Sequence, residues 1–210
     1  MLMDYRFSAI EMVLLVVGKE DIKISVHENV LFEASPVLKA IFTSKFNEGS
    51  ERSIYLPDDD ADLMDALIQN LYAPQSGFSD MRSTMELLRL YVLAAEFDTV
   101  QVMNRICGWL LSNLKGLPPS ASEVEFIYGN TTSERLVRRL MVDWFIWRID
   151  ATWFNKEENC RWLTSVPEFA VDVCAGLAKT VGLRSKLYPL DIDRSLYMEK
   201  EPDKDSEHTK

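Results

Sequence analysis

Residues 13–57 constrain the fold of this chain more than any other stretch, because strand and helix signals follow one another closely there. Residues 13–17 form a run of valines and leucines that ends at Gly18. After a charged turn, residues 22–26 alternate strictly between apolar and polar side chains. Two such runs separated by a short turn are typical of a β-hairpin with one buried face. We therefore expect a hairpin over residues 13–26.

The rest of this stretch predicts two helices and a third strand. Apolar residues fall at helical spacing over residues 30–34. Ser35 and Pro36 then form an N-cap serine followed by a proline at the first helical position, so a new helix is expected to begin at Pro36. Its apolar side chains recur at i, i+3 and i+4 up to Phe42. Residues 53–56 predict a strand that the next residue, a proline, ends.

The same residues resemble the BTB/POZ domain family. The likeness extends from about residue 10 to 115 and is greatest for the short fungal members. Its motifs are His27-x-x-x-Leu31-x-x-x-Ser35-Pro36, a helix ending in Phe42, the loop Lys45-Phe46-Asn47-Glu48, Ile54-x-Leu56-Pro57, Leu71-Tyr72 and the helix end at residues 90–98. The resemblance implies an α+β fold, in which a small sheet is flanked by helices, and a role in protein–protein interaction.

Two positions depart from the usual pattern of that family. The family usually has Asp-Val at the entry to the first strand, where this chain has Glu11, Met12 and Val13. It usually has lysine or arginine after the histidine, where this chain has Glu28. Neither change affects the fold that the resemblance implies.

The resemblance also suggests which residues bind a partner. BTB adaptors that dock onto the cullin scaffold of a ubiquitin ligase carry an apolar-x-Glu motif in the loop that Phe46 and Glu48 occupy here, and Tyr72 matches a tyrosine of their cullin surface. With Phe42 from the preceding helix, these residues form the predicted partner-binding set. The remaining signature residues, expected to be structural, are His27, Leu31, Ser35 and Pro36. In the alternative interpretation, Phe46 packs beneath its own loop and Glu48 is solvated.

Two functions follow from this interpretation. In the first, the protein is an adaptor that recruits a substrate protein to a cullin-type ligase. In the second, it is a homo-oligomerising scaffold or regulatory BTB protein without a ligase role, and a homodimer is its simplest form. Residues 1–12 are too short for the long leading helix that some BTB proteins exchange between subunits, so that kind of dimer is not expected.

Beyond the hairpin region the sequence predicts helices. Asp58, Asp59 and Asp60 can cap a helix over residues 61–72, because carboxylates satisfy the free N–H groups of a first turn. We prefer this cap to a cation site. Residues 73–83 are expected to form a loop that can contain a brief edge strand. Ser83-x-x-Glu86 is a capping box that predicts a central helix over residues 84–97. The next helix has an apolar series from residue 103 to 114.

A boundary is expected near Gly116 and the two prolines that follow it. The predicted divisions are a BTB/POZ domain over residues 10–116, an all-helical C-terminal extension over 117–185 and a disordered charged tail over 186–210. A capping box at Ser120 predicts a short helix over residues 124–128, and one at Ser165 predicts a last helix that ends at Gly182. Between them, residues 134–149 are expected to form another helix. Apolar positions of the last helix, including Cys174 and Ala178, are expected to be buried.

Two side-chain clusters in the extension allow alternative interpretations. Six aromatic residues form either the core of a small helical layer, which we prefer, or anchors for a partner. They are Trp144, Phe145, Trp147, Trp153, Phe154 and Trp162. Arg135, Arg138 and Arg139 form a basic strip that we expect to be a solvated helix face.

Composition excludes several functions. The net charge of -10 opposes binding to a nucleic-acid backbone. Three scattered cysteines favour a reducing compartment and fit no zinc site. The sequence contains no signal peptide, membrane-spanning run, phosphate-binding glycine loop or catalytic motif. We therefore expect a soluble cytoplasmic or nuclear protein that is not an enzyme, with no catalytic residue, metal or cofactor, and no membrane or nucleic-acid partner.

Overall fold

The structure is a computed structural model that describes residues 11–45, 52–75, 78, 83–113, 118–182 and 194–199. It divides into two compact units. Unit 1 consists of Met1–Gly77 and Leu93–Thr99, and unit 2 of Phe78–Val92 and Val100–Lys210. Unit 1 contains the sheet and unit 2 is helical, so the expected α+β fold with a helical C-terminal region is confirmed.

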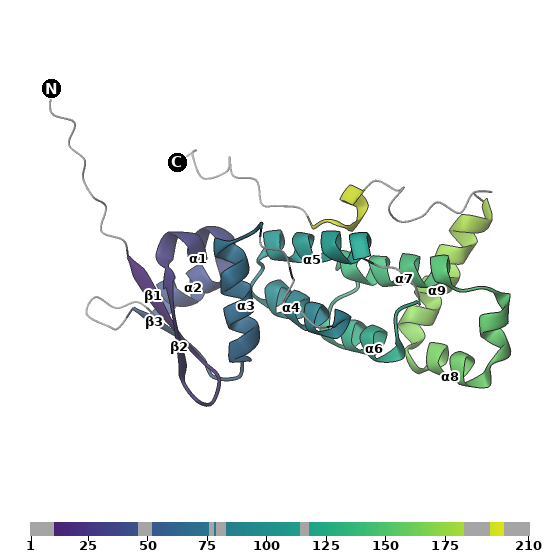
Figure 1. Cartoon of the computed structure of the whole chain (residues 1–210), viewed down its shortest axis with the longest axis horizontal. Coiled ribbons are helices and arrows are strands. Elements are labelled where there is room, and N and C mark those ends of the chain that lie inside the picture. The colour runs from purple at the N-terminus through teal and green to yellow at the C-terminus, as the bar shows by residue number, and fades with distance from the viewer. Residues whose placement is uncertain are drawn as a thin grey trace, which may run out of the picture. The chain divides into compact units, whose positions relative to one another are not determined.

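The sheet has three strands in the order β2-β1-β3 (Figure 1). β1 (Met12–Val17) pairs antiparallel with β2 (Ile22–His27), which confirms the predicted hairpin, and parallel with β3 (Ser53–Leu56). In the middle of the sheet Leu15 lies opposite Ile24 on one side and Ile54 on the other. β1 is therefore the central strand, and its inward side chains form the core of unit 1.

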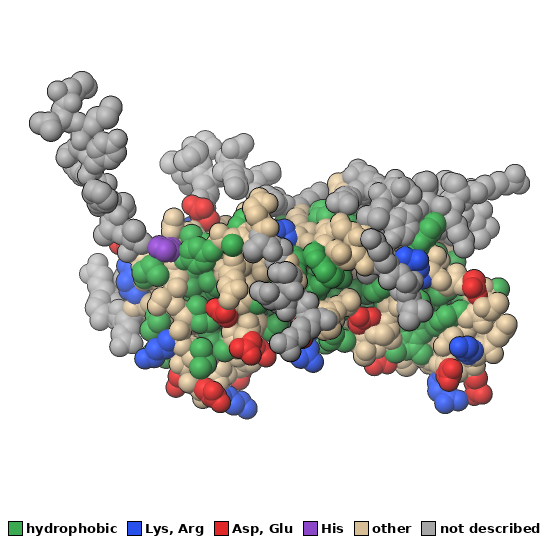
Figure 2. All heavy atoms as spheres, viewed as in Figure 1, with side chains coloured by type: hydrophobic (Ala, Val, Ile, Leu, Met, Phe, Trp, Pro, Cys, Tyr) green, Lys and Arg blue, Asp and Glu red, His purple; other side chains and the backbone are tan. Residues whose placement is uncertain are grey.

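β1 is largely buried on both faces, because Val16 is buried as well as Leu15 and Val17, whereas β2 is buried only in part. Val26 is fully buried, whereas Ile22 is 44% exposed. β2 is an edge strand, and Ile22 stands next to the turn, where charged residues surround it. Figure 2 shows basic and acidic side chains gathered at this tip of the hairpin.

Three helices pack against the sheet of unit 1. α1 (Glu28–Ala34) contacts β2 and α2 (Pro36–Lys45) contacts β3, while α3 (Ala61–Tyr72) contacts both α1 and β2 (Figure 1). Asp60 caps α3 as predicted, because its carboxylate accepts from the backbone N–H groups of Asp62 and Leu63 at 2.9 and 3.1 Å.

Ser35 joins α2 to Phe97, which follows the end of α4 (Thr84–Glu96), within unit 1. Its hydroxyl accepts from the Leu38 N–H at 3.0 Å, as the predicted N-cap requires, and donates to the Phe97 carbonyl at 2.6 Å. The side chain is fully buried. One hydroxyl therefore satisfies a helix donor and a carbonyl 62 residues away.

Replacing Ser35 with alanine is expected to lower the free energy of unfolding by about 2 kcal/mol, because a cap is lost and a buried carbonyl is left unpaired. Urea unfolding followed by circular dichroism measures this change. Ser44→Ala is the matched control on the same helix. The Ser44 side chain is exposed, and among the described residues its hydroxyl bonds to the Ile41 carbonyl alone, so its loss should cost less than about 0.5 kcal/mol. Equal costs would contradict the bridging role of Ser35.

Unit 2 is built from helices joined by short connections. The first of them, α4, continues into unit 1. The described elements are α4 (Thr84–Glu96), α5 (Val100–Asn113), α6 (Ala121–Asn130), α7 (Leu136–Arg148), η1 (Ala151–Asn155), α8 (Glu157–Ser165), α9 (Pro167–Gly182) and η2 (Arg194–Tyr197). On α4, Leu87, Leu88 and Tyr91 are buried, whereas Val92 and Ala95 are half-buried. The described part of the apolar series predicted for α5, residues 103–111, is buried as expected. The Ser83 hydroxyl accepts from the Glu86 N–H at 3.2 Å.

Of the two capping boxes predicted for the C-terminal extension, the helix boundaries confirm one and correct the other. Ser120 and Glu123 form both reciprocal bonds of the box, and α6 is longer than the predicted residues 124–128. The box predicted at Ser165 is wrong, since that residue ends α8 and its hydroxyl donates to the Trp162 carbonyl at 2.7 Å. Glu168 is instead paired with Arg138.

The buried face predicted for α9 is only partly correct. Phe169 and Val173 are buried, but Cys174 and Ala178 are exposed. Only a narrow stripe of α9 contacts α6 and α7, so the flanking small residues face solvent.

Several expectations fall wholly or partly outside the described residues. These include Leu114 and Gly116. The described residues of the 73–83 loop contain no strand. Within the tail predicted to be disordered, residues 194–199 are described, and they differ from that prediction because they contain η2 and the fully buried Tyr197.

Candidate protein-interaction surface

Tyr72 is an exposed aromatic side chain that is held in place by His27. The two residues end α3 and β2, respectively. The His27 backbone N–H donates to the Tyr72 hydroxyl oxygen at 2.8 Å, and His27 Nδ1 lies 2.6 Å from the same oxygen. The rings meet edge to face, with centroids 5.6 Å apart. The tyrosine is nevertheless 45% exposed, so a ring held by hydrogen bonds lies at the surface.

The other signature residues form the interior beside this pair. Leu31 and Ser35 are fully buried, and Pro36 begins α2. Phe42 is only 8% exposed, and its ring packs 5.1 Å from that of Phe32. In the free domain Phe42 therefore offers little surface to a partner. Phe46 and Glu48, the two remaining members of the predicted set, lie outside the described residues.

Arg52 connects both positions at which the chain departs from the family pattern. Its Nη2 lies 2.8 Å from Glu11 Oε2, and the same nitrogen contacts the Glu28 carboxylate. The guanidinium also stands over the Phe42 ring at 5.5 Å. The sequence indicated two unusual acidic residues 17 positions apart but not that one cation pairs with both. Glu28 therefore has a structural role, because it pairs with the arginine that stands over Phe42.

Asp59 carries a perturbed carboxyl group at the start of α3. Partial burial, and then the charges of Glu96 and Asp58, raise the pKa of Asp59 from its ordinary value of 3.8 to about 6. The folded protein therefore holds this proton more tightly than the unfolded chain does. The resulting stabilisation is fully present below pH 3.8 and is lost as the pH rises through 6.

Asp59→Asn is accordingly expected to stabilise the protein at pH 7 but not at pH 4. The gain at pH 7 should be about 1 kcal/mol after allowance for solvent screening, or a rise in Tm of about 2–4 °C. Thermal unfolding of parent and variant at pH 4, 5 and 7 measures it. A gain that is equal at all three values would exclude titration of Asp59 as the cause.

The basic strip predicted on α7 is not a uniform solvated face. Arg138 is buried, because its guanidinium turns toward the end of α6 and donates to the Tyr128 carbonyl at 2.8 Å and to the Thr131 hydroxyl at 3.2 Å. It also reaches Glu168 Oε2 at 2.6 Å. The sequence pattern predicted that Arg138 lies on the polar face of its helix. It could not indicate that the end of a neighbouring helix supplies carbonyl acceptors for it.

The aromatic cluster is mainly a helical core, as preferred above. Phe145 is fully buried, and its ring lies 5.0 to 5.2 Å from those of Trp153, Trp162 and Phe169. Trp144 is buried as well, whereas Phe154 at the edge is 41% exposed. The cluster therefore joins α7, η1, α8 and α9. Trp147, Trp153 and Trp162 are half-buried, and Phe154 is the exposed member.

Comparison with known families decides what residues 11–113 are. They match the model of the BTB/POZ domain. Residues 11–113 form a BTB/POZ domain. BTB domains mediate protein–protein interaction and dimerisation and are typically not catalytic. A search of curated proteins found no match to the chain.

Among the described residues, no helix is long and apolar enough to cross a bilayer. In the same part of the chain, no three histidine, cysteine, aspartate or glutamate side chains lie close enough to hold a metal ion. The Cys107 thiol is fully buried, and burial raises its pKa to about 12, so it stays protonated at neutral pH.

Proposed function

We propose that this BTB protein is an adaptor that brings a substrate protein to a cullin-type ubiquitin ligase. The observation that carries the proposal is the Tyr72 ring, which is exposed although its hydroxyl is held by His27. An aromatic anchor that is already fixed loses little conformational entropy on binding. Such residues are frequent hot spots in protein interfaces.

The rest of the proposed surface follows from the resemblance. Phe46 would enter a groove of the cullin and Glu48 would pair with a basic residue at its rim. Phe42 and Arg52, which lie in contact on the two sides of that loop in the sequence, would help to hold its ends. The helical extension over residues 117–185 would recruit the substrate. We infer that it acts in the cytoplasm or nucleus and that it resembles the short fungal BTB proteins.

Titration calorimetry with a cullin N-terminal domain tests the adaptor role. The parent protein is expected to bind with a Kd of micromolar or tighter, about −8 kcal/mol or more favourable. Tyr72→Ala and the double variant Phe46→Ala/Glu48→Lys should each weaken binding at least tenfold. Tyr55→Ala is the matched control, because Tyr55 is also a well-exposed tyrosine of unit 1 but lies on β3.

Two results would refute the adaptor role. One is a folded parent protein that gives no heat and no complex. The other is a double variant that binds as tightly as the parent. If only Tyr55→Ala weakens binding, the cullin site lies on the sheet and the residue assignment is wrong.

The second candidate is a homo-oligomeric scaffold without a ligase role. It is favoured by the edge position of β2, which pairs with no strand other than β1 among the described residues and carries the exposed Ile22. Free strand edges pair readily with a second chain. Ile22→Lys should then reduce the mass seen by light scattering, whereas Val171→Lys, at an exposed valine of α9, should not. A monomer at every concentration would count against this function.

A further inference from the structure

The segment of residues 194–199 contacts α5 and α7 of unit 2 through η2, and we call the surface that it covers the groove. Tyr197 is fully buried, and its hydroxyl donates to Asp143 Oδ2 of α7 at 2.8 Å. The Arg139 guanidinium stands 5.6 Å from the centre of the tyrosine ring. The Met198 methyl group lies against Gly108 of α5, where a Cβ atom would be 3.9 Å away. An aromatic ring and a thioether thus fill the apolar part of the groove.

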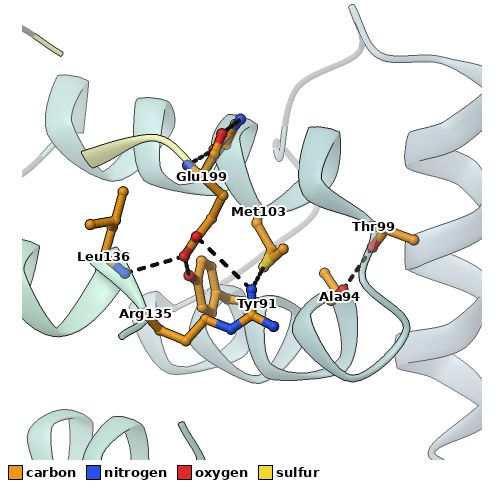
Figure 3. Close-up of polar contacts among 8 residues, drawn as sticks. Tyr91, Ala94, Thr99, Met103, Arg135, Leu136 and Glu199 are labelled. Carbon is orange, nitrogen blue, oxygen red and sulfur yellow. Dashed lines mark hydrogen bonds and ion pairs between the residues drawn. The ribbon is translucent and has the colours of Figure 1, made fainter. Parts of the chain in front are cut away.

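Glu199 is bound at both its backbone and its carboxylate. The Asn104 amide donates to the Glu199 carbonyl at 3.1 Å and accepts from the Glu199 N–H at 2.7 Å. One carboxylate oxygen accepts from the Tyr91 hydroxyl at 3.1 Å and from the Leu136 N–H at 3.2 Å. Figure 3 shows this side chain directed between Tyr91, Leu136 and Arg135.

The groove is electrostatically suited to a carboxylate. Leu136 is the first residue of α7, so its N–H belongs to the positive end of the helix dipole. Arg135 Nη1 lies 4.0 Å from the second carboxylate oxygen. Because the chain carries a net charge of -10, a site that favours an anion is a local feature and not a general property of its surface.

The segment is held in the way that a bound peptide is held. Its only regular structure is the single turn of η2. The hydrogen bonds and the ion pair of Tyr197 and Glu199 run to α4, α5, α7 and the residue before α7. One asparagine side chain pairs with the peptide backbone, which any sequence supplies. Asp143 and Arg139 contact the Tyr197 side chain. Tyr91, Leu136 and Arg135 contact the carboxylate of Glu199, two residues later.

We propose that this groove is a peptide-recognition site for a Tyr-x-Glu segment, and that residues 194–199 are its ligand within the chain. A partner protein with an aromatic hydroxyl two residues before a carboxylate binds there when the chain's own segment leaves. The site is separate from the proposed cullin surface, which lies in unit 1.

A peptide-binding experiment on the full-length protein tests this proposal. The variant Tyr197→Ser/Glu199→Ala releases the chain's own segment, and circular dichroism checks that it stays folded. The probe is a dye-labelled synthetic peptide with the sequence of residues 191–201, followed by fluorescence anisotropy. The released variant is expected to bind it at least tenfold more tightly than the parent, whose tethered segment competes at an effective concentration of order millimolar.

Two controls test the chemistry of recognition. Asn104→Ala in the released variant removes the backbone pairing and should weaken peptide binding at least tenfold. A second probe keeps the tyrosine and the glutamate and has alanine at every other position. It should bind within about tenfold of the first, because the groove reads these two side chains. Loss of binding to this probe would show that the groove does not recognise the tyrosine and the glutamate specifically, and would overturn the proposal.

Two other results would also overturn it. A folded released variant that binds neither probe would show that the groove does not take a separate peptide. A parent protein that is a dimer in size-exclusion chromatography, with a monomeric released variant, would place the segment in the groove of a second copy.

Discussion

Arg138→Met is expected to lower the free energy of unfolding by about 3 kcal/mol. The methionine keeps most of the buried volume but leaves the carbonyls of Tyr128 and Thr131 without the donors that Arg138 supplies. An unpaired buried acceptor costs about 1–3 kcal/mol, and bonds to a charged donor are the stronger kind. Stacking of the guanidinium on the Tyr128 ring at 4.4 Å is lost as well. The expected fall in Tm is about 6–12 °C.

Glu168→Gln is the matched control for this prediction. It removes the charge of the carboxylate that accepts from Arg138 at 2.6 Å but leaves the arginine and its bonds to the end of α6. The Glu168 side chain is 72% exposed, so the ion pair itself should contribute less than about 1 kcal/mol. If both variants lose the same stability, the ion pair and not the helix-end carbonyls explains why Arg138 is buried.

Phe145→Ala should have an effect of similar or larger size. The ring is fully buried and is in contact with those of Trp153, Trp162 and Phe169. Truncation of a buried phenylalanine costs about 3–5 kcal/mol through lost burial and the cavity left behind. Urea unfolding should show a lower midpoint. The near-ultraviolet circular dichroism of the tryptophans should also weaken, because their packing partner is missing.

Phe154→Ala makes the same chemical change at the edge of the same cluster. Its ring contacts Trp153 at 5.1 Å but is 41% exposed, so the cost is expected to be about 1 kcal/mol or less. The difference between the two phenylalanines measures how much of the cluster acts as a core. Similar losses at both positions would contradict the burial pattern described here.

Features that depend on neighbouring residues in the chain were predictable. The hairpin follows from alternation over residues 22–26, and the start of α2 follows from Ser35 and Pro36. The cap of α3 follows from Asp60 in the same way. Each of these signals acts within about one turn of helix or one strand pair, and therefore it is visible in the sequence.

Features that depend on distant segments were not predictable. Arg138 looks like a surface residue because its acceptors come from another helix. Ser165 matched a capping box, but α8 reaches that residue and uses its hydroxyl at its own end. Tyr197 lies where apolar residues are sparse, and only the groove of α5 and α7 explains its burial. For the candidate site, the sequence indicated Tyr72 but not its bonds to His27.

The order of the strands has a consequence for synthesis on the ribosome. β1 receives its antiparallel partner as soon as His27 has been added, but its parallel partner is complete only after the 29 further residues from Glu28 to Leu56. At roughly 5–20 residues per second, this delay is about 1.5 to 6 seconds. During that time one edge of an almost wholly apolar strand has no native partner. Lys19 and Glu20 in the hairpin turn place charge beside the strand, which opposes premature association of nascent chains.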